Sequence, residues 1–252
     1  MYDINFMVYA YDKDSENDVY ASMVVPYIFF ALQTNSNSHV EVIVVDSIKF
    51  KKKYNKELAL LRRKNKNFKI REPVIKHNRH IPNTYRFFEK PVVEATYTYI
   101  TDIDIIFLGS DILDKYKCHW PNNLPYNNIL RNKDSTRLTG VCMIKTKEYY
   151  TEEFDKCRDQ LYALDKNIND EVILGNMCEK LFGLPNYDHR FRPIYGIHFS
   201  PNRGNGCKLG LVTSKKYYDK YMEFKSKHPL LFSFQIFKKL TYELENNFKI
   251  VE

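Results

Sequence analysis

Residues 97–108 read Tyr97-Thr-Tyr-Ile-Thr-Asp102-Ile-Asp104-Ile-Ile-Phe-Leu108, an otherwise apolar run that carries two carboxylates. Residues two apart on a strand point to the same side, so we expect Asp102 and Asp104 to share a face. Two carboxylates this close repel each other, and apolar surroundings solvate charge poorly. A divalent cation with oxygen ligands relieves both effects. The alternative is a buried pair that is satisfied by backbone donors or by an arginine.

The rest of the chain alternates short apolar runs with amphipathic ones. Strands are predicted at Ile4–Ala10, Val40–Val45, Phe68–Ile70, Tyr97–Leu108 and Gly140–Ile144, and helices at Val19–Gln33, Lys51–Lys66, Thr84–Glu94, Glu148–Leu164 and Asp170–Phe182. This rhythm predicts an α/β fold, with a Rossmann-like, mainly parallel sheet flanked by helices. Ligands of such sheets bind beyond the carboxyl ends of the strands. We therefore expect the loop Tyr11–Asp18 and the two aspartates to face one cleft.

Composition sets broader limits. A chain of 252 residues that is 44% hydrophobic can bury a large core, as one domain or as one domain with an extension. No apolar run reaches membrane-spanning length. The five cysteines are scattered without a C-x-x-C motif, which predicts reduced thiols in a cytoplasmic protein and argues against a disulfide framework. The net charge of +8 indicates an anionic partner, such as a nucleotide, a nucleic acid or an acidic membrane surface.

A second candidate segment is Tyr195-Gly-Ile-His198-Phe-Ser-Pro-Asn-Arg203-Gly-Asn-Gly-Cys-Lys208. A neutral imidazole could complete a metal shell with two carboxylates, and the cationic loop after it suits phosphate oxygens. Taken alone, His198 is more often a hydrogen-bonded structural histidine. The Gly-x-Gly is not a dinucleotide fingerprint, because Leu209 stands where the third glycine belongs.

A third candidate is Asn169-Asp-Glu171, which opens an amphipathic helix. Asn169 fits an N-cap, and the acids after it suit the helix dipole. The functional interpretation places Asp170 or Glu171 near a reacting centre. Motifs of other enzyme classes are missing, since the sequence has no G-x-x-x-x-G-K-[ST], G-x-S-x-G or H-E-x-x-H.

Taken in order, these motifs resemble the retaining glycosyltransferases of family 8, which have the GT-A fold and use nucleotide-activated sugars. The resemblance covers about residues 4 to 210 and rests on Ala10-Tyr-Asp12, Asn83-Thr-Tyr-Arg86, Tyr99-Ile-Thr-Asp102-Ile-Asp104-Ile, Leu138-Thr-Gly140-Val141, Asp170-Glu171-Val172 and His198 through Lys208. The chain departs from the family in three places. Leu138 and Thr139 replace residues that touch the donor sugar there, Glu171 stands where glutamine is usual, and the loop from the histidine to the lysine is longer.

The resemblance implies a catalytic domain that binds a nucleotide sugar over residues 1–210, with a helical C-terminal extension over 211–252. It implies a Mn²⁺-dependent hexosyltransferase that retains anomeric configuration, with Mg²⁺ as the alternative ion, UDP-sugar as donor and a glycan, lipid-linked or protein acceptor, without nucleic acid. The implied metal ligands are Asp102, Asp104 and His198, and the implied catalytic residues are Asp170 and Glu171. Binding of the nucleotide sugar falls to Ala10, Tyr11, Asp12, Arg86, Ile103, Arg203 and Lys208, and Arg86 is also expected to hold a carboxylate of the metal pair.

Two other functions compete with this interpretation. A metal-dependent nucleotidyltransferase shares the sheet and the paired aspartates, but no glycine-rich phosphate loop follows the first strand. A non-catalytic module could bind nucleic acid or acidic glycans through the basic segment Lys49–Lys69, which leaves the two aspartates without a purpose. The basic and aromatic C-terminal segment could also dock on a membrane, although packing on the core is the simpler expectation.

Overall fold

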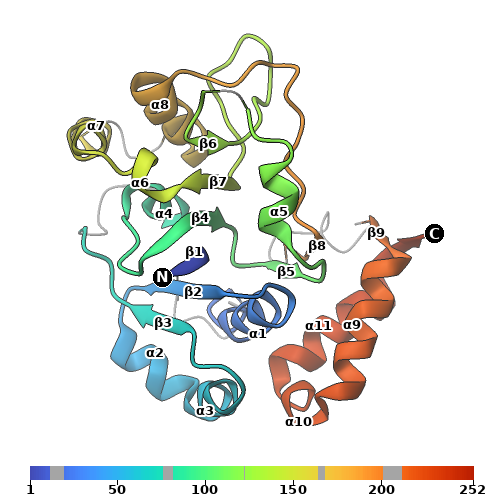
Figure 1. Cartoon of the computed structure of the whole chain (residues 1–252). Coiled ribbons are helices and arrows are strands. Elements are labelled where there is room, and N and C mark those ends of the chain that lie inside the picture. The colour runs from blue at the N-terminus through green and yellow to red at the C-terminus, as the bar shows by residue number, and fades with distance from the viewer. Residues whose placement is uncertain (12–19, 76–81, 122, 164–167, 201–211) are drawn as a thin grey trace.

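The computed structural model describes residues 1–11, 20–75, 82–121, 123–163, 168–200 and 212–252. Its central sheet has the strand order β3-β2-β1-β4-β7-β6 (Figure 1). The four strands β1 (Tyr2–Ala10), β2 (Ser38–Val44), β3 (Phe68–Arg71) and β4 (Ala95–Thr101) are parallel. The edge is antiparallel, because β7 (Cys142–Lys145) runs against β4, and β6 (Tyr126–Asn127) runs against β7. The sheet is therefore mainly parallel, as predicted.

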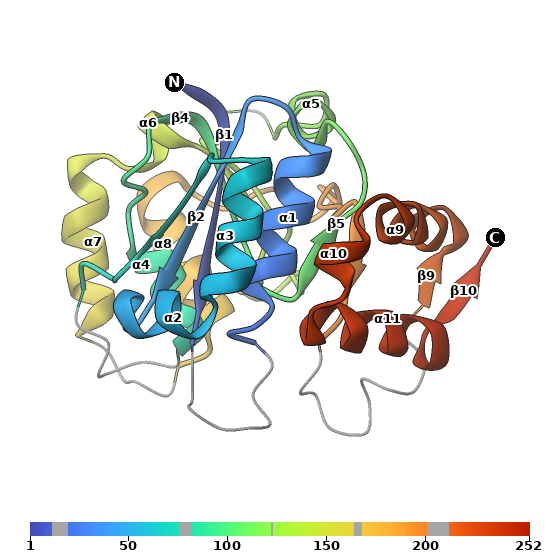
Figure 2. The ribbon, with the colours of Figure 1, turned by 90° about the horizontal axis from the view of Figure 1, so that it is seen from below.

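The central strands are buried on both faces, and the apolar residues of each face pack into their own core. In β1, Phe6 and Val8 belong to one core, whereas Met7 and Tyr9 belong to the other, as strand alternation requires. Two layers of helices cover these faces (Figures 1 and 2). The first layer contains α1 (Val24–Thr34) and α3 (Asn55–Lys64), and the second contains α4 (Tyr85–Phe88), α7 (Glu152–Tyr162) and α8 (Asp170–Phe182).

Three helices near the C-terminus pack against α1 through aromatic rings (Figure 2). They are α9 (Lys215–Lys227), α10 (Pro229–Phe232) and α11 (Gln235–Asn247). The ring of Phe30 stacks on Tyr221 with centroids 5.6 Å apart, and Phe29 meets Phe224 edge-on at 5.8 Å. The aromatic residues considered for membrane contact thus lie largely inside the protein. Within the described ranges, no helix combines the length and hydrophobicity that crossing a membrane requires.

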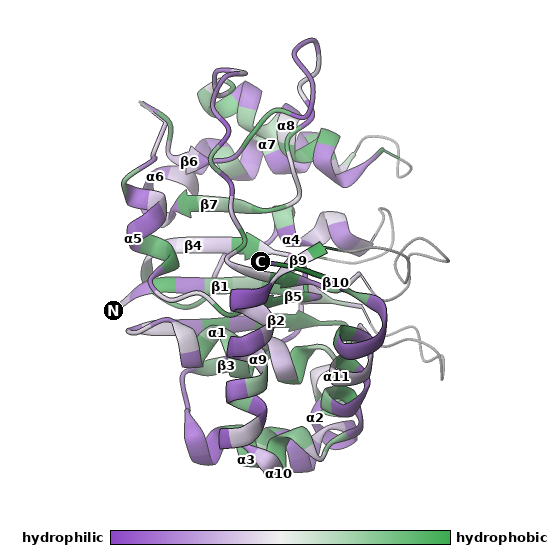
Figure 3. Cartoon of the chain, turned by 90° about the vertical axis from the view of Figure 1, so that its right-hand side faces the viewer, coloured by the Kyte–Doolittle hydropathy of each residue, from purple (hydrophilic) through white to green (hydrophobic). Residues whose placement is uncertain are grey.

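Smaller elements complete the chain. A short parallel pair, β9 (Val212–Ser214) with β10 (Lys249–Val251), joins the two ends of the C-terminal extension, where the sequence predicts helices alone. Helix α5 (Ile112–Lys117) follows residues 97–108, the segment that carries Asp102 and Asp104. Figure 3 shows hydrophobic colour along β7 and parts of β1 and β2, a largely pale β4, and mixed colour along the surrounding helices, the pattern of an amphipathic outer layer. Of the described cysteines, Cys118 is exposed and the others are buried, and all are free thiols.

Several predicted helices are wrong in extent. The structure replaces Lys51–Lys66 by α2 (Ser47–Lys53) and α3, Glu148–Leu164 by α6 (Thr146–Tyr149) and α7, and Thr84–Glu94 by η1 (Pro82–Thr84) and α4. The first of these begins early because Asp46 caps it, its side chain accepting the Lys49 N–H at 2.8 Å. The third ends early because Pro91 disfavours helical backbone in the residue before it. Helix α1 begins at Val24, whereas the sequence predicts a start at Val19.

The prediction of one strand over Tyr97–Leu108 is also wrong. Strand β4 ends at Thr101, a turn covers residues 102–104, and β5 (Ile105–Phe107) belongs to a separate sheet with β8 (Gly196–His198). The Ile105 N–H lies 3.4 Å from the Asp102 carbonyl oxygen and closes the turn. The turn removes both carboxylates from the central sheet, whose apolar faces would solvate them poorly. Their proximity therefore comes from a turn and not from strand alternation.

Candidate metal and donor site

The candidate site lies at the carboxyl ends of β1 and β4, where the strand order reverses. Strands β1, β2 and β3 build the sheet outward in one direction, and β4 starts the other. Val8 is in register with Thr101, so Tyr11 and Asp102 leave the sheet at the same edge. Tyr11 is 36% exposed there, and Asp12 after it lies outside the described residues. Such reversal points are the usual ligand sites of open α/β sheets.

Asp102, Asp104 and His198 form a group of three potential metal ligands. One ligand atom from each residue lies within 4.8 Å of the other two. The pairing of β5 with β8 creates this group, because it places His198 in register with Ile105, directly after Asp104. His198 Nε2 stands 3.1 Å from Asp104 Oδ1, and Asp104 is only 5% exposed. Two carboxylates and one imidazole are a donor set that fits Mn²⁺ or Mg²⁺.

Strand β8, which carries His198, is tightly placed. A Cβ atom on Gly196 would lie 1.9 Å from the Ile106 carbonyl oxygen, so the two backbones approach as closely as they do only because this residue is glycine. The segment before β8 is held by two buried hydroxyls. Tyr99 and Tyr116 donate to the Pro193 carbonyl oxygen at 3.2 and 3.0 Å. His198 therefore projects from a constrained backbone.

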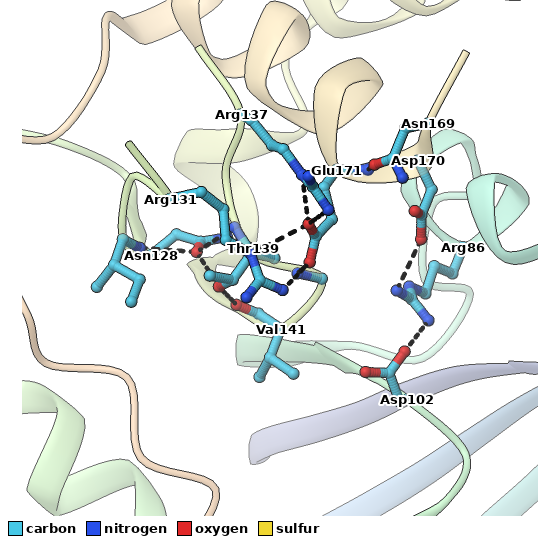
Figure 4. A network of polar contacts seen from close by, with 12 residues as sticks. Arg86, Asp102, Asn128, Arg131, Arg137, Thr139, Val141, Asn169, Asp170 and Glu171 are labelled. Atoms are coloured by element: carbon cyan, nitrogen blue, oxygen red, sulfur yellow. Dashed lines mark hydrogen bonds and ion pairs between the residues drawn. The ribbon is translucent and has the colours of Figure 1, made fainter. Parts of the chain in front are cut away.

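Arg86 links the metal group to helix α8 (Figure 4). Its Nη1 donates to Asp102 Oδ1 at 2.5 Å, and its Nη2 donates to Asp170 Oδ2 at 3.2 Å. Burial opposes the charge of Arg86, but the two carboxylates outweigh burial and raise its pKa above the ordinary value. A carboxylate has two oxygens, so Asp102 can bind Arg86 with one and a cation with the other.

Gly140 gives Arg86 the space to reach both carboxylates. A Cβ atom at this position would lie 2.7 Å from Arg86 Nη2, closer than real side chains allow. The same point is 3.8 Å from Glu171 Oε1. Gly140 is part of the sequence resemblance, and the structure gives a steric reason for glycine at this position.

Glu171 is buried and fully engaged. Its carboxylate accepts the Gly140 N–H at 3.1 Å and the Nε groups of Arg131 and Arg137 at 3.1 and 2.8 Å (Figure 4). Burial would raise the pKa of Glu171, but the two arginines outweigh burial and lower it. Asn169 Oδ1 accepts the Glu171 N–H at 2.9 Å, so the predicted N-cap is present.

The other predicted site residues fall into two groups. Ala10 and Ile103 are 1% and 7% exposed, so their side chains belong to the core, and their part in donor binding stays a prediction. Arg203 and Lys208, like Asp12, lie outside the described residues. The residues that depart from the family, Leu138 and Thr139, are completely buried. Sequence patterns missed Arg131 and Arg137, because their partner Glu171 is 40 and 34 positions away and no local periodicity signals such a contact.

No protein-family model and no curated protein sequence matches the chain. Solved structures match its fold. The apo form of the glycosyltransferase GlyE from Streptococcus pneumoniae TIGR4 covers 93% of this chain with a TM-score of 0.53 and 14% identity. A second GlyE structure covers 73% with a TM-score of 0.50 and 14% identity. The mannosyltransferase PcManGT from Pyrobaculum calidifontis, in complex with GDP-Man and Mn²⁺, covers 95% of this chain and 69% of its own length with a TM-score of 0.47 and 10% identity.

This chain spans about half of the GlyE chains, 52% and 45% of their lengths. At this level of identity the likeness is one of fold. The predicted fold class is confirmed: the chain has a GT-A type α/β fold, with a mainly parallel sheet between helices and a helical C-terminal extension.

Proposed function

We propose that this protein is a metal-dependent glycosyltransferase that moves a sugar from a nucleotide diphosphate sugar, UDP-sugar by the sequence resemblance, to a hydroxyl acceptor. The observation that supports this proposal most is the group Asp102, Asp104 and His198 at the carboxyl edge of a GT-A type sheet. Retention of anomeric configuration is part of the proposal and rests on the resemblance to family 8.

The three ligands would hold Mn²⁺ or Mg²⁺, and the bound ion would act as a Lewis acid on the leaving diphosphate. The remaining work belongs to the chain. Arg86 fixes the orientation of Asp102 through a short charge-assisted hydrogen bond, so that one carboxylate oxygen is presented to the cation position. Strand β8 positions His198, whose Nε2 contacts Asp104. A site that is built in advance loses little entropy when donor binds.

Asp170 and Glu171 take different roles in this proposal. Asp170 uses one oxygen on Arg86 and keeps a second, which we assign to orienting the donor sugar or to stabilising positive charge that develops at its anomeric carbon. Glu171 has both oxygens engaged and a lowered pKa, so we assign it to positioning the start of α8. This narrows the pair of catalytic candidates to one residue.

We assign the residues that would bind the nucleotide half of the donor from the sequence resemblance and from their position at the carboxyl edge of the sheet. Tyr11 and Asp12 follow β1 and would stack on, or hydrogen-bond to, the base. Ala10 and Ile103 would border the nucleotide with their backbone. Arg203 or Lys208 would add positive charge beside the diphosphate.

A donor screen tests the proposal. UDP- and GDP-sugars are incubated with the protein and Mn²⁺, and release of the free nucleotide is measured with and without EDTA. We expect metal-dependent hydrolysis of at least one UDP-sugar, its loss in EDTA, and its loss in Asp104→Asn at unchanged secondary structure by circular dichroism. Equal activity in EDTA, or no turnover and no binding of any nucleotide sugar, would refute the assignment.

A further inference from the structure

A second charged cluster, formed by Arg131, Arg137 and Glu171, lies beside the Arg86–Asp170 pair (Figure 4). Arg131 contacts both oxygens of Glu171, through Nε at 3.1 Å and through a shorter contact from Nη2. Arg137 contacts Oε2 through Nε at 2.8 Å and Nη2 at 2.7 Å. Two guanidinium groups thus share one carboxylate, and the cluster keeps an excess positive charge.

The loop that carries the two arginines is fixed on α8. A Cβ atom on Gly175 would lie 1.9 Å from the Thr136 carbonyl oxygen, so the loop backbone rests directly on the helix. The Thr136 hydroxyl donates to Asn176 Oδ1 at 3.0 Å, and the Leu138 N–H donates to the Glu171 carbonyl oxygen at 3.3 Å. The arginines therefore project from a backbone that is already ordered.

The guanidinium groups are held but still open to solvent. The side chains of Arg131 and Arg137 are 45% and 41% exposed, whereas that of Glu171 is 10% exposed. Each guanidinium has five N–H donors, and the contacts to Glu171 use only part of them. One bidentate arginine is enough to neutralise a carboxylate. The second brings like charges together. Asp102 and Asp170 offset part of this repulsion, since both contribute to raising the pKa of Arg131, and an anion from solution would offset more of it.

The cluster adjoins the proposed reaction centre. The position of a Cβ atom on Gly140 is 2.7 Å from Arg86 Nη2 and 3.8 Å from Glu171 Oε1, so the Arg86 pair and the cluster meet at one point. Asp170 and Glu171 are consecutive residues in the first turn of α8. Asp170 and the two arginines thus flank Glu171 (Figure 4), so the proposed oxyanion site and the proposed sugar-orienting carboxylate belong to one region of the chain.

We propose that Arg131 and Arg137 form an oxyanion site that binds a carboxylate or phosphate carried by one of the sugar substrates. This inference rests on the proposed function, because it places the anion on a substrate of that reaction. Arginine suits the role better than lysine, since its planar fork matches carboxylate and phosphate oxygens in pairs. Glu171 acts as the internal carboxylate that holds the two forks in place.

Calorimetric titration with sulfate, glucuronate, glucose 6-phosphate and glucose tests the site directly, in the absence and presence of saturating UDP and Mn²⁺. We expect at least one oxyanion probe to bind the wild type at least tenfold more tightly than Arg131→Gln or Arg137→Gln, and glucose to show no such difference. Each single variant leaves one arginine on Glu171, which protects the fold. Lys133→Gln, exposed in the same loop, is the matched control for loss of charge alone.

The double variant Arg131→Lys/Arg137→Lys keeps both charges without the forks and is expected to weaken oxyanion binding as the glutamine variants do. Equal affinities for every probe in wild type and variants would overturn the proposal, as would an equal loss in Lys133→Gln. Abolition of oxyanion binding by UDP and Mn²⁺ would also overturn it, because the arginines would then serve the donor diphosphate. Oxyanion binding without any binding of UDP or GDP would instead overturn the proposed function, and with it the assignment of the anion to a sugar substrate, while the oxyanion site itself would stand.

Two further arms identify the source of the anion. Glucuronate compared with glucose 6-phosphate separates a carboxylate from a phosphate. Hydrolysis of UDP-glucuronate compared with UDP-glucose, without acceptor, separates the substrates. A preference for UDP-glucuronate that disappears in Arg131→Gln places the anion on the donor, and oxyanion binding without that preference places it on the acceptor.

Discussion

Replacing Gly140 by alanine tests whether Arg86 is held as the structure shows. The new Cβ atom would lie 2.7 Å from Arg86 Nη2, whereas ordinary contacts begin at 3.4 Å, so the guanidinium must retreat by about 0.7 Å. The side chain of Arg86 is 4% exposed and is bound on both sides by carboxylates, so this retreat strains an ion pair. Overpacking of this kind costs about 1–3 kcal/mol of the free energy of unfolding.

A double-mutant cycle makes the test specific. Urea denaturation, followed by the fluorescence of the single tryptophan, is measured for Gly140→Ala, Arg86→Met and the double variant. In the Arg86→Met background the clashing atom is gone, so alanine at position 140 should cost less than about 0.5 kcal/mol. Gly140→Ala should also weaken Mn²⁺ binding about tenfold, because Asp102 loses its fixed orientation. Equal costs in both backgrounds would refute the placement of Arg86.

Two further predictions concern stability. Burial lowers the pKa of His39 to about 4, and the nearby charge of Lys69 adds to this effect. As pH falls from about 6.5 to 4, the unfolded state therefore takes up a proton at His39 that the folded state does not. This difference removes up to about 3 kcal/mol from the free energy of unfolding. Urea denaturation from pH 7 to 4 should show a larger loss in the wild type than in His39→Gln, by up to about 3 kcal/mol, because His189 and His228 also have lowered pKa values and contribute to both proteins. Parallel curves for the two proteins would contradict the assignment to His39. Phe237→Ala removes a completely buried ring that lies 4.8 Å from the ring of Phe232, and it should cost about 3–5 kcal/mol in urea denaturation. A cost below about 1 kcal/mol would mean that the C-terminal helices do not pack on α1 through this cluster.

The fold class could be predicted because local patterns carry it. The predicted strands Ile4–Ala10 and Val40–Val45 are buried on both faces of a parallel sheet, except for Val45 at the end of the second, which is exposed. Their regular separation by amphipathic segments leaves few other architectures. Helix ends were predicted less well, because they depend on single residues. Asp46 starts a helix early and Pro91 stops one early, and each overrides the periodicity around it.

The candidate site shows the opposite balance. Its carboxylates were visible as charges in an apolar run, but the reason given for their proximity was wrong, since a turn and not a strand brings Asp102 near Asp104. The contacts that organise the site join distant positions, as Arg131 does with Glu171. A single sequence gives no signal for such contacts. The sequence also gives no signal that Gly140 makes room for Arg86 or that Gly196 lets β8 approach the backbone of Ile106.

The proposed function requires that Asp102, Asp104 and His198 bind one divalent cation and that this cation in turn binds a nucleotide diphosphate. A titration of the purified protein with Mn²⁺, followed by electron paramagnetic resonance with and without UDP, tests both requirements. We expect one Mn²⁺ per chain, tighter binding of Mn²⁺ when UDP is present, and a loss of Mn²⁺ affinity of at least about tenfold in Asp104→Asn and in His198→Gln. Unchanged Mn²⁺ affinity in both variants, or binding that UDP does not affect, would contradict it.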